Sequence, residues 1–161
     1  MTTTVETTEA KNSKKAPHIE DIERHSLNTE KVVKKVLIVE DDQAFRPFWE
    51  KVFQPYNAKI DWATTSEGAE ELIRLRFKKR DPYDLVISDI FLEGEGSGID
   101  LWNRYGEETL NFIFVSGLPL SKYDLLMTLN FGCPIYLKKP LSIQSCREIV
   151  NNVLTSNEEN E

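Results

Sequence analysis

Hydrophobic residues fall into short blocks along most of the chain, and the blocks alternate between two spacings. Continuous apolar runs that end in polar residues are typical of buried parallel strands, and such runs predict strands over 36–39, 85–89, 112–115 and 135–137. A second, weaker strand is expected over 58–63. Between the runs, apolar residues recur at helical spacing. Five strand–helix units in succession predict an α/β fold, a doubly wound (βα)5 parallel sheet with helices on both faces.

Proline and capping residues set several of the expected helix boundaries. The first helix is expected to begin near Arg46 or to have a distorted first turn, because Pro47 lacks a backbone donor and fits only the first turn. Ser142 has the side chain of a good N-cap and is expected to open the last helix. Between these two, the spacing predicts a short helix over 99–105 and a longer helix over 118–131.

The second predicted helix opens with Thr64-x-x-Glu67, which matches a capping box. Glu70 and Arg74 have the spacing of a favourable ion pair. The end of this helix is basic and carries Arg74, Arg76, Lys78, Lys79 and Arg80. Cations stabilise the C-terminal end of a helix, and the whole chain has a net charge of −7, so we interpret the cluster as helix stabilisation and expect no nucleic-acid binding.

The two ends of the chain differ from the middle. Residues 1–34 are rich in Thr, Glu, Lys, Asn and Ser, so a disordered N-terminal tail is expected there. Residues 155–161 predict a disordered acidic tail, which leaves one domain over 35–154. The first ten residues lack the apolar core of a secretory signal, and no apolar run approaches the roughly 18 residues of a membrane span. A cytoplasmic protein without membrane contacts is therefore expected.

Charged and polar side chains stand where four of the predicted strands end. The carboxyl ends of parallel strands share one edge of a sheet, where ligands bind in such folds. The residues at these ends are Glu40, Asp41 and Asp42 after the first strand, Asp89 on the third, Ser116 after the fourth and Lys139 after the fifth. They are expected to converge on one rim.

The grouped carboxylates repel one another and therefore predict a bound cation. Oxygen ligands with room for water suit Mg²⁺. Asp89 is then placed to attack a phosphoryl group and form an acyl phosphate. Lys139 and Ser116 are placed to hold the phosphoryl oxygens.

These residues, in this order on these strands, resemble the receiver domains of two-component response regulators, the CheY-like superfamily, over about residues 35–154. The resemblance implies that Asp89 is the phosphoacceptor and that Asp41 and Asp89 are direct Mg²⁺ ligands. It implies that Glu40 acts on the metal through water and that the backbone carbonyl of Phe91 completes the protein ligands.

The same resemblance assigns roles on the last two strands. It implies that Ser116 is the switch hydroxyl, that Tyr136 is the aromatic residue that rotates with it, and that Lys139 binds phosphate. It also implies a cis peptide bond between Lys139 and Pro140. Asp42 lies one position beyond the acidic pair, so we interpret it as a helix cap that can also serve in the outer shell of the metal site.

In such a protein a histidine kinase or a histidine phosphotransfer protein donates the phosphoryl group, and the receiver catalyses only its own phosphorylation and dephosphorylation. Seven residues follow Leu154, so we expect a stand-alone regulator that signals through a partner protein. The partner is expected on the face formed by the fourth helix, the fifth strand and the fifth helix.

Two other functions remain open at this point. A Mg²⁺-dependent phosphatase with an aspartyl nucleophile has a similar rim, but it carries the nucleophile on the first strand, two residues before a second Asp. Asp42 is followed two positions later by Ala44, which fails that pattern. A degenerate receiver that only binds partners is the other alternative.

The loop after Asp89 departs from the usual sequence of the family, because Glu93 stands where a proline is usual.

Two side chains in the surrounding loops are expected to set the lifetime of the acyl phosphate. Phe91 lies two positions after Asp89 and Leu118 two positions after Ser116, and neither can orient an attacking water. Slow self-dephosphorylation is therefore predicted.

Overall fold

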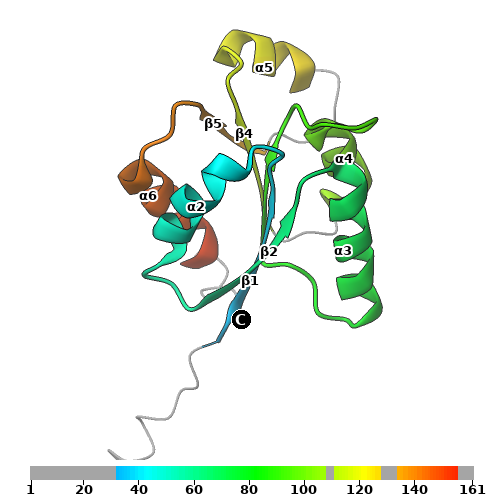
Figure 1. Cartoon of the computed structure of the whole chain (residues 1–161), viewed down its shortest axis with the longest axis vertical. Helices are drawn as coiled ribbons and strands as arrows, with labels where there is room; N and C mark the ends of the chain where they lie inside the picture. Colours follow the sequence, from blue (N-terminus) through cyan, green and yellow to red (C-terminus); the bar gives the residue numbers. More distant parts are fainter. Residues whose placement is uncertain (1–31, 108–110, 128–133, 156–161) are drawn as a thin grey trace, which may run out of the picture. The chain divides into compact units, whose positions relative to one another are not determined.

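Five parallel strands form one sheet in the order β2-β1-β3-β4-β5, which confirms the predicted fold class (Figure 1). The computed structural model describes residues 32–107, 111–127 and 134–155. Their elements are β1 (Lys34–Val39), η1 (Gln43–Phe45), α2 (Arg46–Phe53), β2 (Ala58–Ala63), α3 (Ser66–Lys78), β3 (Leu85–Asp89), α4 (Gly98–Tyr105), β4 (Phe112–Ser116), α5 (Leu120–Met127), β5 (Ile135–Lys138) and α6 (Ile143–Thr155).

Alternate residues of each strand point to opposite faces of the sheet, and each face has its own apolar core. On one face Val36 and Ile38 of β1 pack with Trp49 of α2 and Val150 of α6. On the other face Leu37 and Val39 pack in a second cluster that holds residues of α3, α4 and α5. Figure 1 shows α2 and α6 on one side of the sheet and α3 and α4 on the other. The sheet is therefore covered on both faces, as its continuous apolar strands require.

Hydrogen bonds join α2 directly to α6. The Arg147 guanidinium donates to the backbone carbonyls of Val52 at 3.3 Å and Lys51 at 2.5 Å, which are in the last turn of α2. In return, the Tyr56 hydroxyl donates to the backbone carbonyl of Arg147 at 2.8 Å. The bonds from Arg147 satisfy carbonyls that the end of α2 leaves unpaired, and together with the bond from Tyr56 they hold the two helices together.

The start of α3 differs from its prediction. The N-cap is Thr65, whose hydroxyl accepts from the Gly68 amide at 3.1 Å, so the predicted capping box at Thr64 is wrong. Glu67 instead accepts a hydrogen bond from the Gly96 amide at 3.1 Å. The Glu67 carboxylate, which the capping box would have used, is therefore bonded to an amide of the β3–α4 loop.

The predicted Glu70–Arg74 ion pair is also replaced by contacts between helices. Glu70 accepts from the Arg104 guanidinium at 2.8 Å and from the Tyr105 hydroxyl at 2.7 Å, and both partners lie on α4. In the basic cluster, Arg76 bonds to Asp61 of β2 at 2.9 Å. Packing of α3 against its neighbours therefore decides these pairings, which spacing within one helix cannot reveal.

The remaining boundaries agree closely with the sequence analysis. α2 begins at Arg46 with Pro47 in its first turn, as predicted. α5 begins at Leu120, two residues later than expected, because Pro119 disfavours a helical backbone at Leu118 and its own carbonyl accepts the first helical hydrogen bonds, from Lys122 and Tyr123. The end predicted for that helix at residue 131 lies outside the described residues, as do residues 1–31 and 156–161 of the predicted tails. The boundaries predicted for the tails differ by one residue from the structure, since Lys34 begins β1 and Thr155 ends α6. Among the described helices none has the length and apolar character needed to cross a bilayer.

Candidate functional site

The strand order places the carboxyl ends of β1 and β3 side by side. β1 pairs with β2 on one side and with β3 on the other, so the chain winds in opposite directions from β1. Ligands of open α/β sheets bind at such a reversal, beyond the strand ends. Glu40 and Asp41 directly follow β1, and Asp89 is the last residue of β3.

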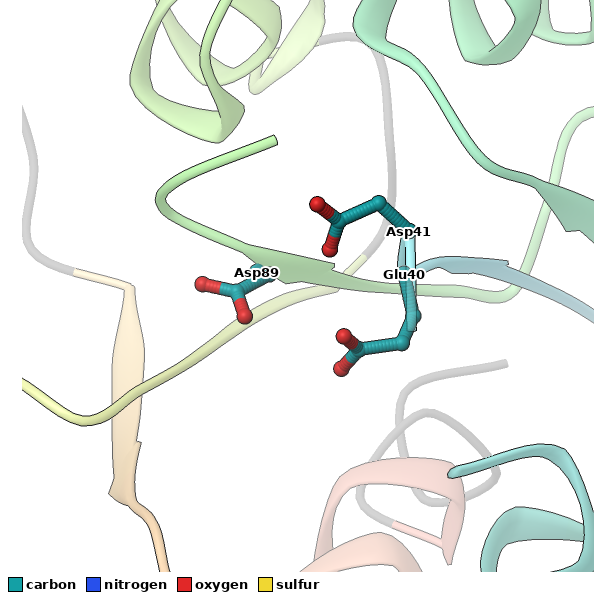
Figure 2. A group of neighbouring side chains, drawn as sticks. All are labelled: Glu40, Asp41 and Asp89. Carbon is teal, nitrogen blue, oxygen red and sulfur yellow. The ribbon is translucent and has the colours of Figure 1, made fainter. Parts of the chain in front are cut away.

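These three carboxylates form one group. Oxygen atoms of Glu40, Asp41 and Asp89 lie within 4.8 Å of one another. Figure 2 shows the three side chains reaching from the two neighbouring strand ends toward the same side. Glu40 and Asp89 are buried at 5% and 9% exposure, whereas Asp41 is half-buried. The group thus combines two sheltered carboxylates with one that solvent reaches.

Lys139 lies among these carboxylates. Its Nζ donates to Glu40 Oε2 at 2.9 Å and to Asp89 Oδ2 at 2.8 Å. Burial tends to lower the pKa of Lys139, but these hydrogen bonds outweigh burial and hold its pKa above the ordinary value. Burial raises the pKa of Glu40, although Lys139 acts in the opposite direction. The hydrogen-bonded geometry is that of an ion pair, in which the ammonium offsets the crowded negative charge.

The Lys139–Pro140 peptide bond is cis, as the resemblance implied. The backbone amide of Lys139 donates to the Ser116 carbonyl at 2.8 Å and so ties the end of β5 to the end of β4. This bond helps to fix where the lysine side chain leaves the sheet.

Ser116 ends β4 and is 1% exposed. Asp89, the candidate phosphoacceptor, is paired with Val115 in the sheet. Ser116 therefore lies one residue further toward the carboxyl edge of the sheet than Asp89. Its hydroxyl accepts weakly from the Leu118 amide at 3.4 Å. The Tyr136 hydroxyl lies 3.1 Å from the Ser116 carbonyl oxygen and 2.5 Å from that of Leu118. Ser116, Leu118 and Tyr136 therefore form one connected group at the end of β4.

Phe91 lies at the start of the loop after β3. Its backbone amide donates to Asp89 Oδ1 at 3.1 Å, and its side chain is 59% exposed. The loop returns at Gly98, whose amide donates to the Ile90 carbonyl at 3.0 Å. A Cβ at Gly98 would lie 2.1 Å from the Asp89 carbonyl oxygen, so only glycine allows this close approach.

Three residues with no predicted role in the site lie next to it or its loops in the structure. Phe45 lies beneath Lys139, with Nζ 4.1 Å from its ring centroid. Glu67 holds the β3–α4 loop, and Tyr123 stacks on Tyr136. Helical spacing marks Phe45 only as a core residue, and no sequence signal marks contacts between separate elements. Asp42 caps η1 through its bond from the Ala44 amide at 2.9 Å, which confirms its predicted capping role.

The donor set fits a hard divalent cation. Three carboxylates from adjacent strand ends supply oxygen ligands, and the exposure of Asp41 leaves room for water. The same rim brings an ammonium group to the Asp89 carboxylate. An anionic group that arrives at Asp89 would therefore meet positive charge from Lys139 and from a cation on the carboxylates.

Comparison with known proteins gives consistent results. The profile of the response regulator receiver domain matches residues 36–151. The two-component response regulator ARR11 of Arabidopsis thaliana is 28% identical over 121 residues, which are 74% of this chain and 22% of that protein. Response regulator ArlR of Staphylococcus epidermidis is 28% identical over 119 residues, which are 74% of this chain and 52% of ArlR. The chain thus spans between about a fifth and about half of the length of these relatives.

Solved structures show the same fold. A receiver domain protein (CheY-like) from Methanospirillum hungatei JF-1 has a TM-score of 0.67 at 22% identity and covers 81% of this chain and 100% of its own. A two-component response regulator from Clostridium difficile has a TM-score of 0.64 at 24% identity and covers 80% of this chain and 99% of its own. With the family profile matched over most of its length, the chain belongs to the response regulator receiver domain family of two-component signalling.

Proposed function

We propose that this protein accepts a phosphoryl group on Asp89 from a histidine kinase or a histidine phosphotransfer protein and signals through protein contacts. The observation that carries the proposal is the pair formed by Asp89 Oδ2 and Lys139 Nζ at 2.8 Å, beside the carboxylates of Glu40 and Asp41. This pair joins a nucleophile to a cation that can neutralise a transferred phosphoryl group.

In the proposed transfer, a carboxylate oxygen of Asp89 attacks phosphorus in line with the bond that breaks. With a phosphohistidine donor, the P–N bond breaks and its electron pair stays on the imidazole nitrogen, which takes up a proton. Lys139 turns from the carboxylates to the phosphoryl oxygens, and the Ser116 hydroxyl donates to another of them. The product is an acyl phosphate on Asp89.

We propose that Asp41, Asp89 and the Phe91 backbone carbonyl hold Mg²⁺, with Glu40 acting through water. When bound, the ion neutralises charge on the phosphoryl oxygens and on the carboxylates. The chemistry of the donor set supports this choice, since hard oxygen ligands with access to water suit Mg²⁺.

For output we propose the face made by α5, β5 and α6, in a cytoplasmic signalling protein. Ser116 and Tyr136 support this choice, because the Tyr136 hydroxyl reaches the Ser116 carbonyl while its ring lies on Tyr123 of α5. A shift of Ser116 toward the phosphoryl group would therefore move Tyr136 and, through the stacked ring of Tyr123, displace α5.

The test is labelling of the purified chain with acetyl phosphate and Mg²⁺, followed by intact mass. We expect one added phosphoryl group, lost in Asp89→Asn and retained in Asp84→Asn. Asp84 is a matched control because its carboxylate accepts from the Lys35 amide at 2.6 Å, away from the rim. Labelling that survives in Asp89→Asn would contradict the acceptor assignment, and steady hydrolysis of a small phosphate ester would favour a phosphatase.

A further inference from the structure

The Lys139 ammonium has an aromatic neighbour besides its two carboxylates. Nζ lies 4.1 Å from the centroid of the Phe45 ring. A cation over the face of an aromatic ring is attracted by the negative charge of that face. The Lys139 side chain is only 19% exposed, so little water competes with this attraction.

The ring is held in place by its own segment. Asp42 caps η1, and the Phe45 amide donates to the Asp42 carbonyl at 3.0 Å. The Phe45 ring also meets Phe48 edge-on, with centroids 6.4 Å apart and planes at 79°. Phe45 therefore has supports other than Lys139 and can act as a fixed surface for the ammonium.

We propose that Phe45 is a positioning residue that keeps the Lys139 ammonium beside Asp89 while the carboxylates change partners. The proposal rests on the proposed phosphoryl transfer. In that reaction Glu40 and Asp89, which now hold Lys139, become engaged with the metal and the phosphoryl group. A phenyl ring offers no oxygen ligand and no site for phosphorylation, so it stays a partner of the ammonium throughout.

The contact has a signature that does not depend on phosphorylation. A ring below the end of the lysine side chain shifts the proton resonances of the terminal methylene upfield. We expect this shift for Lys139 in the full chain without metal or donor, assigned by its loss in Lys139→Arg. It should vanish in Phe45→Leu and persist in Phe77→Leu, a partly buried phenylalanine packed against the cluster on the other face of the sheet.

The role in the reaction is tested by the rate of labelling with acetyl phosphate and Mg²⁺. Phe45→Leu keeps an apolar side chain but removes the ring, and we expect labelling to slow by about five- to tenfold. Phe45→Tyr should retain most of the rate, because its ring keeps the negative face. Phe77→Leu should label at the wild-type rate, which separates the effect from a general loss of packing.

A double-mutant cycle shows whether Phe45 acts through Lys139. In Lys139→Met, adding Phe45→Leu should slow labelling no further, and an equal further slowing would overturn the role. Wild-type labelling in Phe45→Leu despite the lost methylene shift would also overturn it while leaving the proposed function intact. Absence of the shift in the wild type would overturn the contact itself. Failure of the wild type to label would overturn the proposed function, and this role with it, whatever the shift.

Discussion

The ring of Tyr136 is stacked on the ring of Tyr123, with centroids 4.2 Å apart and planes 15° apart. Tyr136 belongs to β5 and Tyr123 to α5, and Tyr123 is 1% exposed. The Tyr136 hydroxyl also reaches the carbonyls of Ser116 and Leu118. One side chain therefore touches the end of β4, the β4–α5 loop and α5 at the same time.

Removal of the Tyr136 hydroxyl should separate its hydrogen bonding from its stacking. We expect Tyr136→Phe to lower the free energy of unfolding by about 1 kcal/mol. Tyr136→Leu, which also loses the stack, should lose about a further 1 kcal/mol. Labelling of Asp89 should continue in both variants, since the Tyr136 hydroxyl bonds to the backbone carbonyls of Ser116 and Leu118 and, among the described residues, to no carboxylate. Urea unfolding and intact mass measure the two effects, and equal stability of Tyr136→Phe and wild type would show that the hydroxyl adds nothing.

The carboxylates should differ in their importance for Mg²⁺. Asp41→Asn removes a proposed direct ligand and is expected to weaken Mg²⁺ binding at least about tenfold, because an amide is a poorer ligand than a carboxylate. Asp42→Asn should bind Mg²⁺ nearly as the wild type does, because Asp42 caps η1 and Asn is an equally good cap. Calorimetric titration of both variants decides the point. Equal affinities would remove Asp41 from the ligand set.

Gly98 should tolerate no side chain. In Gly98→Ala the new Cβ would collide with the Asp89 carbonyl oxygen, 2.1 Å away, so the backbone that carries Asp89 must move. We expect a loss of about 1–3 kcal/mol in stability, with slower labelling of Asp89. Gly117→Ala is the control, because a Cβ there would meet nothing within 4 Å. Thermal unfolding and the rate of Asp89 labelling are measured for both variants. Equal stability and equal labelling rates of Gly98→Ala and Gly117→Ala would contradict this prediction.

Arg76 should stabilise the fold in a pH-dependent way. Burial tends to raise the pKa of Asp61, but hydrogen bonds from Arg76 and Tyr83 outweigh burial and hold this pKa below its ordinary value. Since the folded pKa lies below the unfolded one, the contribution is complete above the unfolded pKa of about 4 and is lost as pH falls through the folded pKa.

We therefore expect Arg76→Met to cost about 1–3 kcal/mol at pH 7 and clearly less in acid, near and below pH 3. Arg74→Met, an exposed position on the same helix, should cost no more than about 0.5 kcal/mol. Urea unfolding across this pH range provides the measurement. A cost for Arg76→Met that stayed constant with pH would rule out the Asp61 linkage.

The lifetime of the proposed acyl phosphate should depend on Leu118 more than on Phe91. Phe91 is 59% exposed, whereas Leu118 is half-buried beside Ser116, so Leu118 is better placed to exclude water. We expect Leu118→Glu to speed decay by about tenfold, which corresponds to about 1.4 kcal/mol in the barrier, and Phe91→Asn to speed it less. Decay of labelled protein after removal of the donor gives the rates. If neither substitution speeds decay, the side chains do not set the lifetime.

The sheet and its chemical rim were predictable because both depend on short stretches of sequence. Apolar runs identify the strands, and the residues that follow each run must lie at the carboxyl edge of a parallel sheet. The positions of Asp41, Asp89 and Lys139 could therefore be inferred without coordinates. The roles of these residues in phosphoryl transfer remain predictions until labelling tests them.

What the sequence could not predict are choices between competing partners. Glu67 fits a capping box in sequence, but in the structure the Gly96 amide takes its carboxylate. Glu70 has Arg74 at the right spacing, yet it bonds to Arg104 and Tyr105 across the helix interface. Such choices depend on distances between elements that are far apart in the chain, which local spacing does not contain.

The bonds that join α2 to α6 set this pair of helices apart from α5. Sliding of these helices would break the bonds from the Arg147 guanidinium to the end of α2 and the return bond from Tyr56. On the opposite face, Glu70 bonds α3 to α4, whereas α5 is reached through the Leu118 loop and the stack of Tyr123 on Tyr136. We expect the α2–α6 side to serve as a rigid frame, so that displacement generated at Asp89 travels into α5. A partner that binds both α5 and α6 would then sense the motion of one helix relative to a stationary one.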